Sequence, residues 1–111
     1  MINMIVQNKD VDLEKLEEKV SRKILGCDGS LMMVEVHFEK GGIGEVHSHS
    51  DHEQVSYIVE GSFKVTVGDK EKVLETGDSF YAGENVDHGV EALEDAIILD
   101  VFTPIREEFL E

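Results

Sequence analysis

The sequence predicts an all-β protein, a sandwich or barrel built from many short strands. Turn signals recur about every eight to twelve residues, which is typical of these architectures. Ten glycines stand among the short strands, and no low-complexity tract or solenoid-length repeat interrupts them. Of the 111 residues 41% are apolar, so the chain can build one hydrophobic core and is expected to form one domain over 1–111.

The first predicted element is a short helix over 12–20. Leu13, Leu16 and Val20 recur at helical spacing, and Asp12 can cap the first turn. After this helix we expect only strands and turns. The stretch around Cys27, between a glycine and an aspartate, is expected to be a turn.

The strands follow from alternation of apolar and polar residues between turn signals. Over 31–39 the apolar side chains fall at alternate positions and would share one face. Two further strands, 55–60 and 62–67, meet at Gly61. The remaining strands are expected over 72–75, 80–82, 89–93 and 96–102. Pro104 ends the last strand, and the tail 106–111 is expected to form a helical turn or an ordered extension.

Charge and targeting signals limit the partners. The net charge of −15 repels nucleic acid and anionic lipid, so neither is expected to bind. An anionic ligand must find a local cation, and the chain has only two arginines, Arg22 and Arg106, beside its lysines. No apolar run approaches the roughly 20 residues that span a bilayer, and 1–10 lacks a signal-peptide pattern. A lone Cys27 favours the cytoplasm and, next to an aspartate, is a poor nucleophile.

Histidines supply the clearest chemical signal. Of five, three fall within six residues, His47, His49 and His52. On a strand, residues two apart share a face, so His47 and His49 can form half of a metal site. His88, which follows a turn-rich segment, is the candidate from a second strand. His52 is expected to be a solvated loop residue, and His37 lies on the polar face of its strand.

The spacing of these histidines resembles the cupin superfamily. The first cupin motif is matched over 41–61 by Gly41, the His47-Ser48-His49 triplet, Gln54 and Gly61, and the second over 77–88 by Gly77 to His88. The second motif departs from the family pattern, with Gly83 in place of its usual proline, Asn85 in place of glycine and Ala92 in place of asparagine. The resemblance implies a cupin double-stranded β-helix, a jelly-roll barrel, with a metal ion inside.

Over 20–110 the chain also resembles the pectin degradation cupins, the KdgF type. The similar segments are 20–25, 31–34, 52–55, 89–96 and 100–110. The resemblance implies four metal ligands, His47, His49, Gln54 and His88. It also implies that Asp100, Phe102 and Arg106 line the active-site pocket. The family acts on unsaturated monouronates from pectin and alginate.

The identity of the fourth ligand is open from strand parity alone. If Glu53 points inward, Val55, Tyr57 and Val59 form an ordinary core face, and parity mildly favours this register. If Gln54 points inward, as the resemblance implies, that apolar face points outward. An exposed face of this kind would need a cover, most simply a second copy of the chain, so we expect a homodimer.

Two C-terminal residues carry arguments of their own. Asp100 is the one carboxylate in the apolar run 96–102, where a buried charge needs a partner or a function. It can be a structural ion-pair partner, a group that orients a ligand histidine, or a catalytic acid or base. Arg106 can grip a substrate carboxylate with two hydrogen bonds or form a surface ion pair. Tyr81 is expected to pack rather than to donate a proton.

These observations predict a metal-dependent isomerase-type enzyme of uronate catabolism. It would convert a 4,5-unsaturated monouronate to its linear keto form, with Asp100, Arg106 and Phe102 as catalytic residues. Four neutral ligands favour Lewis-acid chemistry, and nickel, zinc, manganese and iron all suit imidazole and amide donors. A metal-dependent cupin dioxygenase and a non-catalytic ligand-binding cupin are the alternatives.

Overall fold

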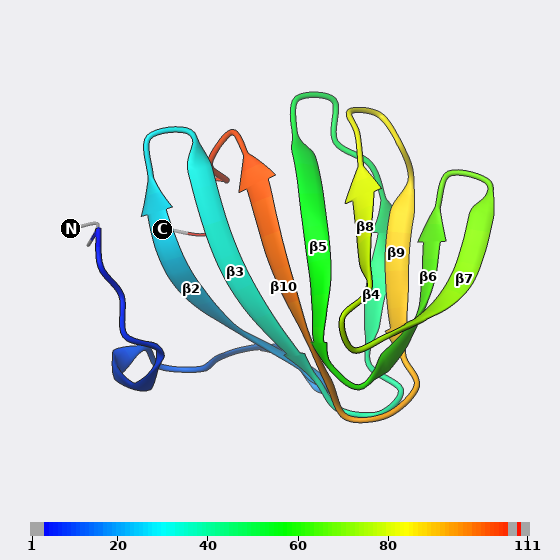
Figure 1. Cartoon of the computed structure of the whole chain (residues 1–111), viewed down its shortest axis with the longest axis horizontal. Helices are drawn as coiled ribbons and strands as arrows, with labels where there is room; N and C mark the ends of the chain where they lie inside the picture. The colour runs from blue at the N-terminus through cyan, green and yellow to red at the C-terminus, as the bar shows by residue number, and fades with distance from the viewer. Residues whose placement is uncertain (1–3, 107–108, 110–111) are drawn as a thin grey trace.

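Two antiparallel sheets face each other in the computed structural model, which describes residues 4–106 and 109 (Figure 1). One sheet has six strands in the order β1-β2-β3-β10-β5-β8, and the other has four in the order β4-β9-β6-β7. The larger sheet contains β1 (Glu14–Glu17), β2 (Val20–Asp28), β3 (Leu31–Phe38), β10 (Ala96–Thr103), β5 (Glu53–Glu60) and β8 (Ser79–Ala82). The smaller sheet contains β4 (Ile43–His47), β9 (His88–Ala92), β6 (Ser62–Val67) and β7 (Lys70–Glu75). The all-β prediction is confirmed.

The helix predicted over 12–20 is wrong. The described helix is a single 3-10 turn, η1 (Asn8–Asp10), and Glu14–Glu17 forms edge strand β1 against β2. Leu13 and Leu16 are 49% and 46% exposed, so their helical spacing does not mark a buried face. Pairing with β2 therefore overrides the local pattern. No described helix is long and apolar enough to span a bilayer.

The turn predicted around Cys27 is also wrong, because Cys27 lies in β2 and is buried. The register of β2 against β3 shifts between Ile24 and Cys27, and Gly26 falls within this irregularity. A glycine at a bulge resembles a turn signal in sequence, which explains the error. Burial raises the pKa of the Cys27 thiol, and the neighbouring Asp28 adds to the rise, so the thiolate is disfavoured as expected.

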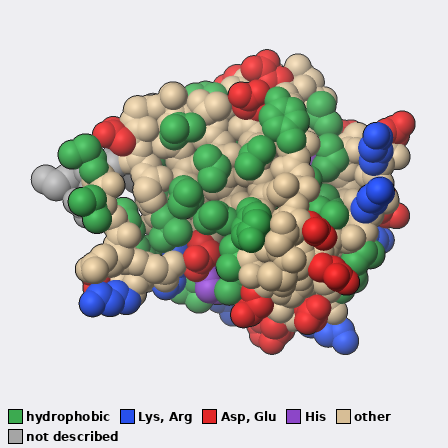
Figure 2. All heavy atoms as spheres, in the orientation of Figure 1, with side chains coloured by type: hydrophobic (Ala, Val, Ile, Leu, Met, Phe, Trp, Pro, Cys, Tyr) green, Lys and Arg blue, Asp and Glu red, His purple; other side chains and the backbone are tan. Residues whose placement is uncertain are grey.

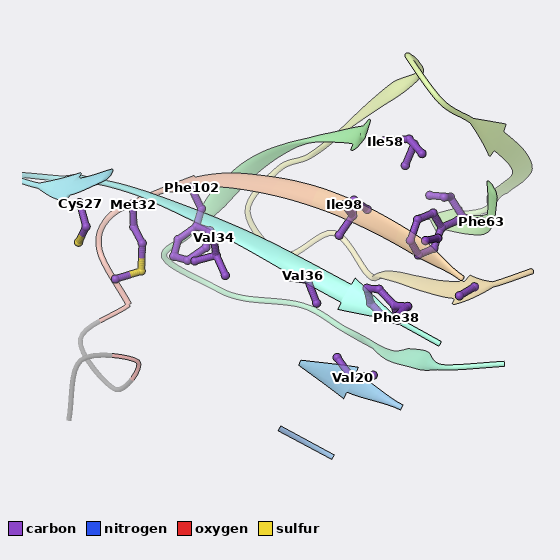
Figure 3. Packing of buried hydrophobic residues seen from close by; sticks show 13 residues of the cluster. Val20, Cys27, Met32, Val34, Val36, Phe38, Ile58, Phe63, Ile98 and Phe102 are labelled. Carbon is purple, nitrogen blue, oxygen red and sulfur yellow. The ribbon is translucent and has the colours of Figure 1, made fainter. Parts of the chain in front are cut away.

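The core fills the space between the two sheets. Alternate side chains of β3 (Met32, Val34 and Val36) point to the same side of the strand, as the sequence predicts (Figure 3). They pack with Phe63 of the smaller sheet and with buried residues of β10 and β5, all within one cluster. At the corner between β5 and β6, Gly61 has φ of 83°, and a Cβ there would lie 2.7 Å from Asp95 O. Only glycine fits this crossing between sheets.

Candidate metal centre and ligand cavity

A cavity of about 330 Å³ lies between the two sheets. Its wall is largely apolar, with side chains from β3, β8 and β10. A smaller set of polar and charged residues interrupts this wall: Glu17, Arg22, Glu45, His47, Gln54, His88, Asp100 and Arg106. A mostly apolar pocket with a few converging polar groups is typical of a small-molecule site.

Three histidines lie close together, and two of them, His47 and His88, line this cavity. His47 ends β4 and pairs in register with His88, the first residue of β9, and their ring centroids are 4.5 Å apart. His49 lies two residues past β4, with its ring centroid 4.8 Å from that of His47 and 6.2 Å from that of His88. The expected grouping of three histidines from two distant segments is therefore present in the structure.

Backbone carbonyls fix which ring nitrogen faces a ligand. His47 Nδ1 lies 2.6 Å from the Glu45 carbonyl oxygen, and His88 Nδ1 lies 3.0 Å from that of Val86. Because a carbonyl only accepts, both rings donate from Nδ1 and present the lone pair of Nε2. Nε2 of His88 and Nε2 of His49 are buried without a hydrogen-bond partner among the described residues. Such orphaned nitrogen atoms fit a metal ion.

The protonation states suit metal binding. Burial and the nearby charge of Arg106 lower the pKa of His49 to about 4. Burial also lowers the pKa of His88, although its bond to the Val86 carbonyl opposes this. Both imidazoles are thus neutral at pH 7, as a ligand must be. In the described part of the chain, no three His, Cys, Asp or Glu side chains already form a closed metal-binding group.

The turn before His88 accommodates one departure from the cupin motif. Asn85, which replaces the usual glycine, has φ of 61°. Asparagine tolerates this left-handed conformation better than most residues, so the turn keeps its shape. The Asn85 N–H donates to the carbonyl oxygen of His49 at 2.7 Å. The loop that carries one histidine is thereby tied to the segment that leads to the other.

Gln54 points inward on β5, and Glu53 points outward. Gln54 lines the cavity, and the next inward residues, Ser56 and Ile58, are both fully buried. Glu53 is exposed and accepts a 2.8 Å hydrogen bond from the Tyr81 hydroxyl on the outer face. The register mildly favoured by strand parity is therefore wrong, and the one implied by the resemblance is present. Tyr81 is 56% exposed and does not line the cavity.

Asp100 occupies the inner face of β10, where Val34 and Ser56 are its register partners on either side. Ser56 Oγ donates to Asp100 Oδ1 at 2.6 Å and accepts a 3.0 Å bond from Gln54 Nε2. Burial raises the pKa of the Asp100 carboxyl to about 6, despite the opposing effects of this bond and of the charges of His47 and Arg106. A carboxyl of this kind can both accept and release a proton near neutral pH.

The C-terminal segment closes one side of the cavity. Phe102 is buried on β10, and Arg106 lines the cavity, as does Phe109. The Phe109 N–H donates to the Arg106 carbonyl oxygen at 3.0 Å. The Phe109 ring meets the Phe102 ring edge to face, with 5.9 Å between the ring centroids. Most of the tail expected as a helical turn lies outside the described residues, namely 107–108 and 110–111.

The two other histidines have different surroundings. His52 was expected to be solvated, but its side chain is only 15% exposed and its ring centroid lies 5.1 Å from that of His49. His37 Nε2 lies 2.6 Å from Glu35 Oε1 outside this cavity, as its place on the polar face of β3 predicts. Sequence reasoning missed Ser56 and the cavity-lining position of Arg22. The alternation Val20, Arg22, Ile24 was the available signal for the arginine.

Comparison with known proteins agrees with this geometry. The Cupin_2 family model, a cupin domain, matches residues 34–102. This chain belongs to the cupin family. Within the cupins it belongs with the pectin degradation protein KdgF of Dickeya dadantii (strain 3937), which is 43% identical over 98 residues, 87% of this chain and 89% of that protein.

Two solved cupin structures match nearly the whole chain. The structure of KdgF from Halomonas sp. has a TM-score of 0.93 at 34% identity and covers 96% of this chain and 98% of that chain. An RmlC-like cupin from Shewanella frigidimarina NCIMB 400 has a TM-score of 0.92 at 40% identity and covers 96% of each chain. Cupins commonly bind a divalent metal ion, and the three imidazoles and one amide of this cupin are suitable donors.

Proposed function

We propose that this cupin is a metal-dependent enzyme of uronate catabolism that converts a 4,5-unsaturated monouronate to its linear keto form. The observation that carries the proposal is the cavity, which is lined by two residues of the histidine cluster, His47 and His88, by a buried carboxyl of raised pKa and by an arginine. The relationship to the pectin degradation protein KdgF supports the choice of a sugar acid as substrate.

Four neutral side chains would hold the metal ion: His47, His49, Gln54 and His88. Gln54 Nε2 donates to Ser56 Oγ, which leaves Oε1 as the amide atom for an ion. With no anionic ligand, a divalent ion would act there as a Lewis acid toward a substrate oxygen. Nickel, zinc, manganese and iron are all compatible with this donor set.

The residues of the chain supply the proton transfer. Ring opening takes the proton from the C1 hydroxyl and breaks the bond between C1 and the ring oxygen, which leaves the electron pair on that oxygen. Tautomerisation then delivers a proton to C4 and yields the keto group. One proton leaves and one returns, so a single carboxyl is sufficient, and Asp100 is the group suited to both steps.

Two further residues position the substrate. Arg106 holds the substrate carboxylate, for which the planar guanidinium offers two parallel hydrogen bonds. Phe102 forms an apolar wall beside the reacting ring. In a protein of net charge −15 such a local cation is required for an anionic substrate to enter.

The test is an activity assay on an unsaturated monouronate prepared with a uronate lyase. Loss of the absorbance of the C4–C5 double bond is followed with protein freed of metal by a chelator and then reloaded separately with each of the four ions. We expect the loss to exceed the uncatalysed rate only in reloaded protein. A rate equal to the uncatalysed one with every ion would overturn the proposal, and oxygen uptake with iron would favour a dioxygenase.

The outer face of the six-stranded sheet supports the proposal of a homodimer. Met33, Val101, Val55 and Tyr81 form one row across β3, β10, β5 and β8, and Leu99 and Tyr57 continue the patch. Val55 and Tyr57 are 49% and 46% exposed. Hydrophobic side chains gather over these strands in the space-filling view (Figure 2).

A second copy of the chain is the occupant that this face fits. The row of Met33, Val101, Val55 and Tyr81 carries no charge, and in the next row the charge of Glu35 stands at the end beside Leu99. Because the chain as a whole carries −15, this face can approach its own copy with less repulsion than the rest of the surface. A twofold axis would pair the same apolar rows with each other. We also place the protein in the cytoplasm, where a single buried thiol such as Cys27 stays reduced.

A further inference from the structure

Arg22 is a buried cation that the proposed reaction does not use. It lies on the inner face of β2 between Val20 and Ile24, and the residue is only 8% exposed. Its ion-pair partner among the described residues is Glu14, whose Oε1 lies 3.3 Å from Nη2. The Glu14 side chain is 57% exposed, so this pair compensates the buried charge only at its solvent edge.

The guanidinium also holds an unused donor. Arg22 Nε is buried and has no hydrogen-bond partner in the described part of the chain. A buried N–H donor without an acceptor costs free energy, and this cost is larger when the donor belongs to a charged group than when it belongs to a neutral one. Such a donor is tolerated when a ligand supplies the missing acceptor. The simplest explanation of the unpaired Nε is therefore an acceptor that comes from outside the chain.

The cavity is where that acceptor can come from. Arg22 lines the same cavity as Asp100 and Arg106. Arg22 and Arg106 both lie over the ring of Phe109, with Cζ 4.0 Å and 4.3 Å from its centroid. An aromatic face stabilises a desolvated guanidinium, and it leaves the edge of the group, which carries the N–H donors, available.

The sheet register shows how far Arg22 stands from the proposed acid–base group. Arg22 pairs with Val36, and Asp100 pairs with Val34, two residues along the same strand β3. From the strand spacing and the rise per residue, the two backbones are about 12 Å apart. The backbone of Arg22 therefore stands apart from Asp100, and its side chain extends to the ring of Phe109, where Arg106 also lies. At this position a bound sugar acid would place oxygens that take no part in proton transfer.

We propose that Arg22 is a second ligand-binding arginine, which donates to the carboxylate of the sugar acid together with Arg106 and selects for acids over neutral sugars. This inference rests on the proposed function for the identity of the ligand. Arg22 is a specificity-determining residue here, since it binds the ligand and moves no proton. Phe109 holds both cations against one ring and so sets their positions.

The test compares the binding of D-galacturonate, a saturated acid, with that of the neutral D-galactose by calorimetry on metal-loaded protein. The Arg22→Met variant keeps an unbranched apolar side chain in place of the aliphatic part of the arginine and removes the guanidinium with its charge. We expect its Kd for galacturonate to rise by roughly 10- to 100-fold, the scale of a hydrogen bond to a charged group, with galactose binding unchanged. Arg22→Lys should restore only part of the preference, because an ammonium group lacks the Nε donor.

The matched control is Lys23→Met, which removes the same charge from the next residue of β2. Lys23 points outward and its Nζ donates to Asn8 Oδ1 at 2.7 Å, so its loss should leave the preference for the acid intact. Circular dichroism and the melting temperature report whether each variant is folded. If Arg22→Met is destabilised, the same comparison is made with Arg22→Lys, which keeps the charge.

The outcomes separate this inference from the proposed function. On an unsaturated uronate we expect Arg22→Met to raise KM with little change in kcat, whereas a change at Asp100 should act on kcat. Unaltered preference for galacturonate in a folded Arg22 variant would overturn the inference, even if the wild type turns over the unsaturated uronate. Absence of turnover in the wild type would overturn the proposed function, while an Arg22-dependent preference for the acid would still support this one.

Discussion

Ser56 Oγ donates a 2.6 Å hydrogen bond to Asp100 Oδ1, and the two residues are direct register partners on β5 and β10. Ser56 is fully buried, so water does not compete for this bond. The bond opposes the effect of burial, which raises the pKa of Asp100 to about 6. Because Ser56 also accepts from Gln54, the proposed acid–base group and the proposed metal ligand share one hydroxyl.

Ser56→Ala should therefore move the pH dependence of the reaction. Without the hydroxyl the carboxylate loses a donor, so the pKa of Asp100 rises further above its present value of about 6. If Asp100 must first accept a proton, kcat rises with pH through this pKa, and its midpoint should shift to higher pH in the variant. Ser62→Ala, which removes a hydroxyl bonded to Glu94 on the far sheet, is the control and should leave the profile in place.

Asp100→Asn should lower turnover by roughly 10²–10⁴-fold, the usual contribution of a positioned acid–base group. Metal content should stay unchanged, because the four proposed ligands remain.

The Asp100→Asn variant should also be more stable than the wild type at pH 8 when both proteins are free of metal. A raised carboxyl pKa means that the unfavourable ionisation of Asp100 is absent below pH 3.8 and fully present above about 6.

The stability gain should reach at most about 2–3 kcal/mol at pH 8 and vanish below pH 4. Denaturant unfolding of both proteins at several pH values measures it. A gain that is the same at pH 4 and pH 8 would show that the ionisation of Asp100 is not its cause.

Replacement of any one of His47, His49 or His88 by alanine should remove most of the bound metal, because each supplies one of the few donors. The barrel should stay folded, since its core is an apolar cluster that contains none of these histidines and includes Ile58 and Phe63 away from the cavity. Metal analysis after dialysis and circular dichroism of the same samples check both statements. His37→Ala, outside the cavity, is the control, and full occupancy in His88→Ala would mean that the site is misassigned.

Gln54→Ala should weaken metal binding, and Glu53→Ala should barely alter it. The reason is their opposite orientation on β5, with Gln54 facing the cavity and Glu53 bonded to Tyr81 on the outside. Gln54→Glu should retain the ion but lower its Lewis acidity, since a carboxylate adds negative charge to the ligands. A titration of metal affinity across the three variants gives the ranking, and a greater loss in Glu53→Ala than in Gln54→Ala would contradict it.

Tyr57→Lys should convert the proposed dimer to a monomer, because it places a charge within the apolar patch of the outer sheet face. Sedimentation velocity measures the change in mass. Val73→Lys is the matched control, since Val73 is 58% exposed on β7 of the other sheet and its replacement adds the same charge. Equal masses for the Tyr57 variant and the wild type would exclude this face as the interface.

The sequence predicted β3 and the strands from β5 onward because apolar alternation and turn residues act locally, whereas no strand was predicted with the bounds of β2 or β4. It failed at the N-terminal edge, where Leu13 and Leu16 have helical spacing but β1 forms by pairing with β2. It also failed at Gly26, because a bulge and a turn use the same residue type. In the site, the histidines were found by spacing and Asp100 by its apolar surroundings. The roles of Ser56 and Arg22 were missed because they depend on which strands become neighbours, although alternation already placed Arg22 on the same face as Val20 and Ile24.

The polar residues of the cavity are divided between the two sheets. His47 and His88 extend from the four-stranded sheet, whereas Gln54 and Asp100 belong to the six-stranded sheet. An ion or sugar acid bound by residues of both sheets would therefore link the two sheets to each other. Opening motions at this end of the barrel, which hydrogen exchange of β4, β9 and β5 would detect, should then be suppressed together when the site fills.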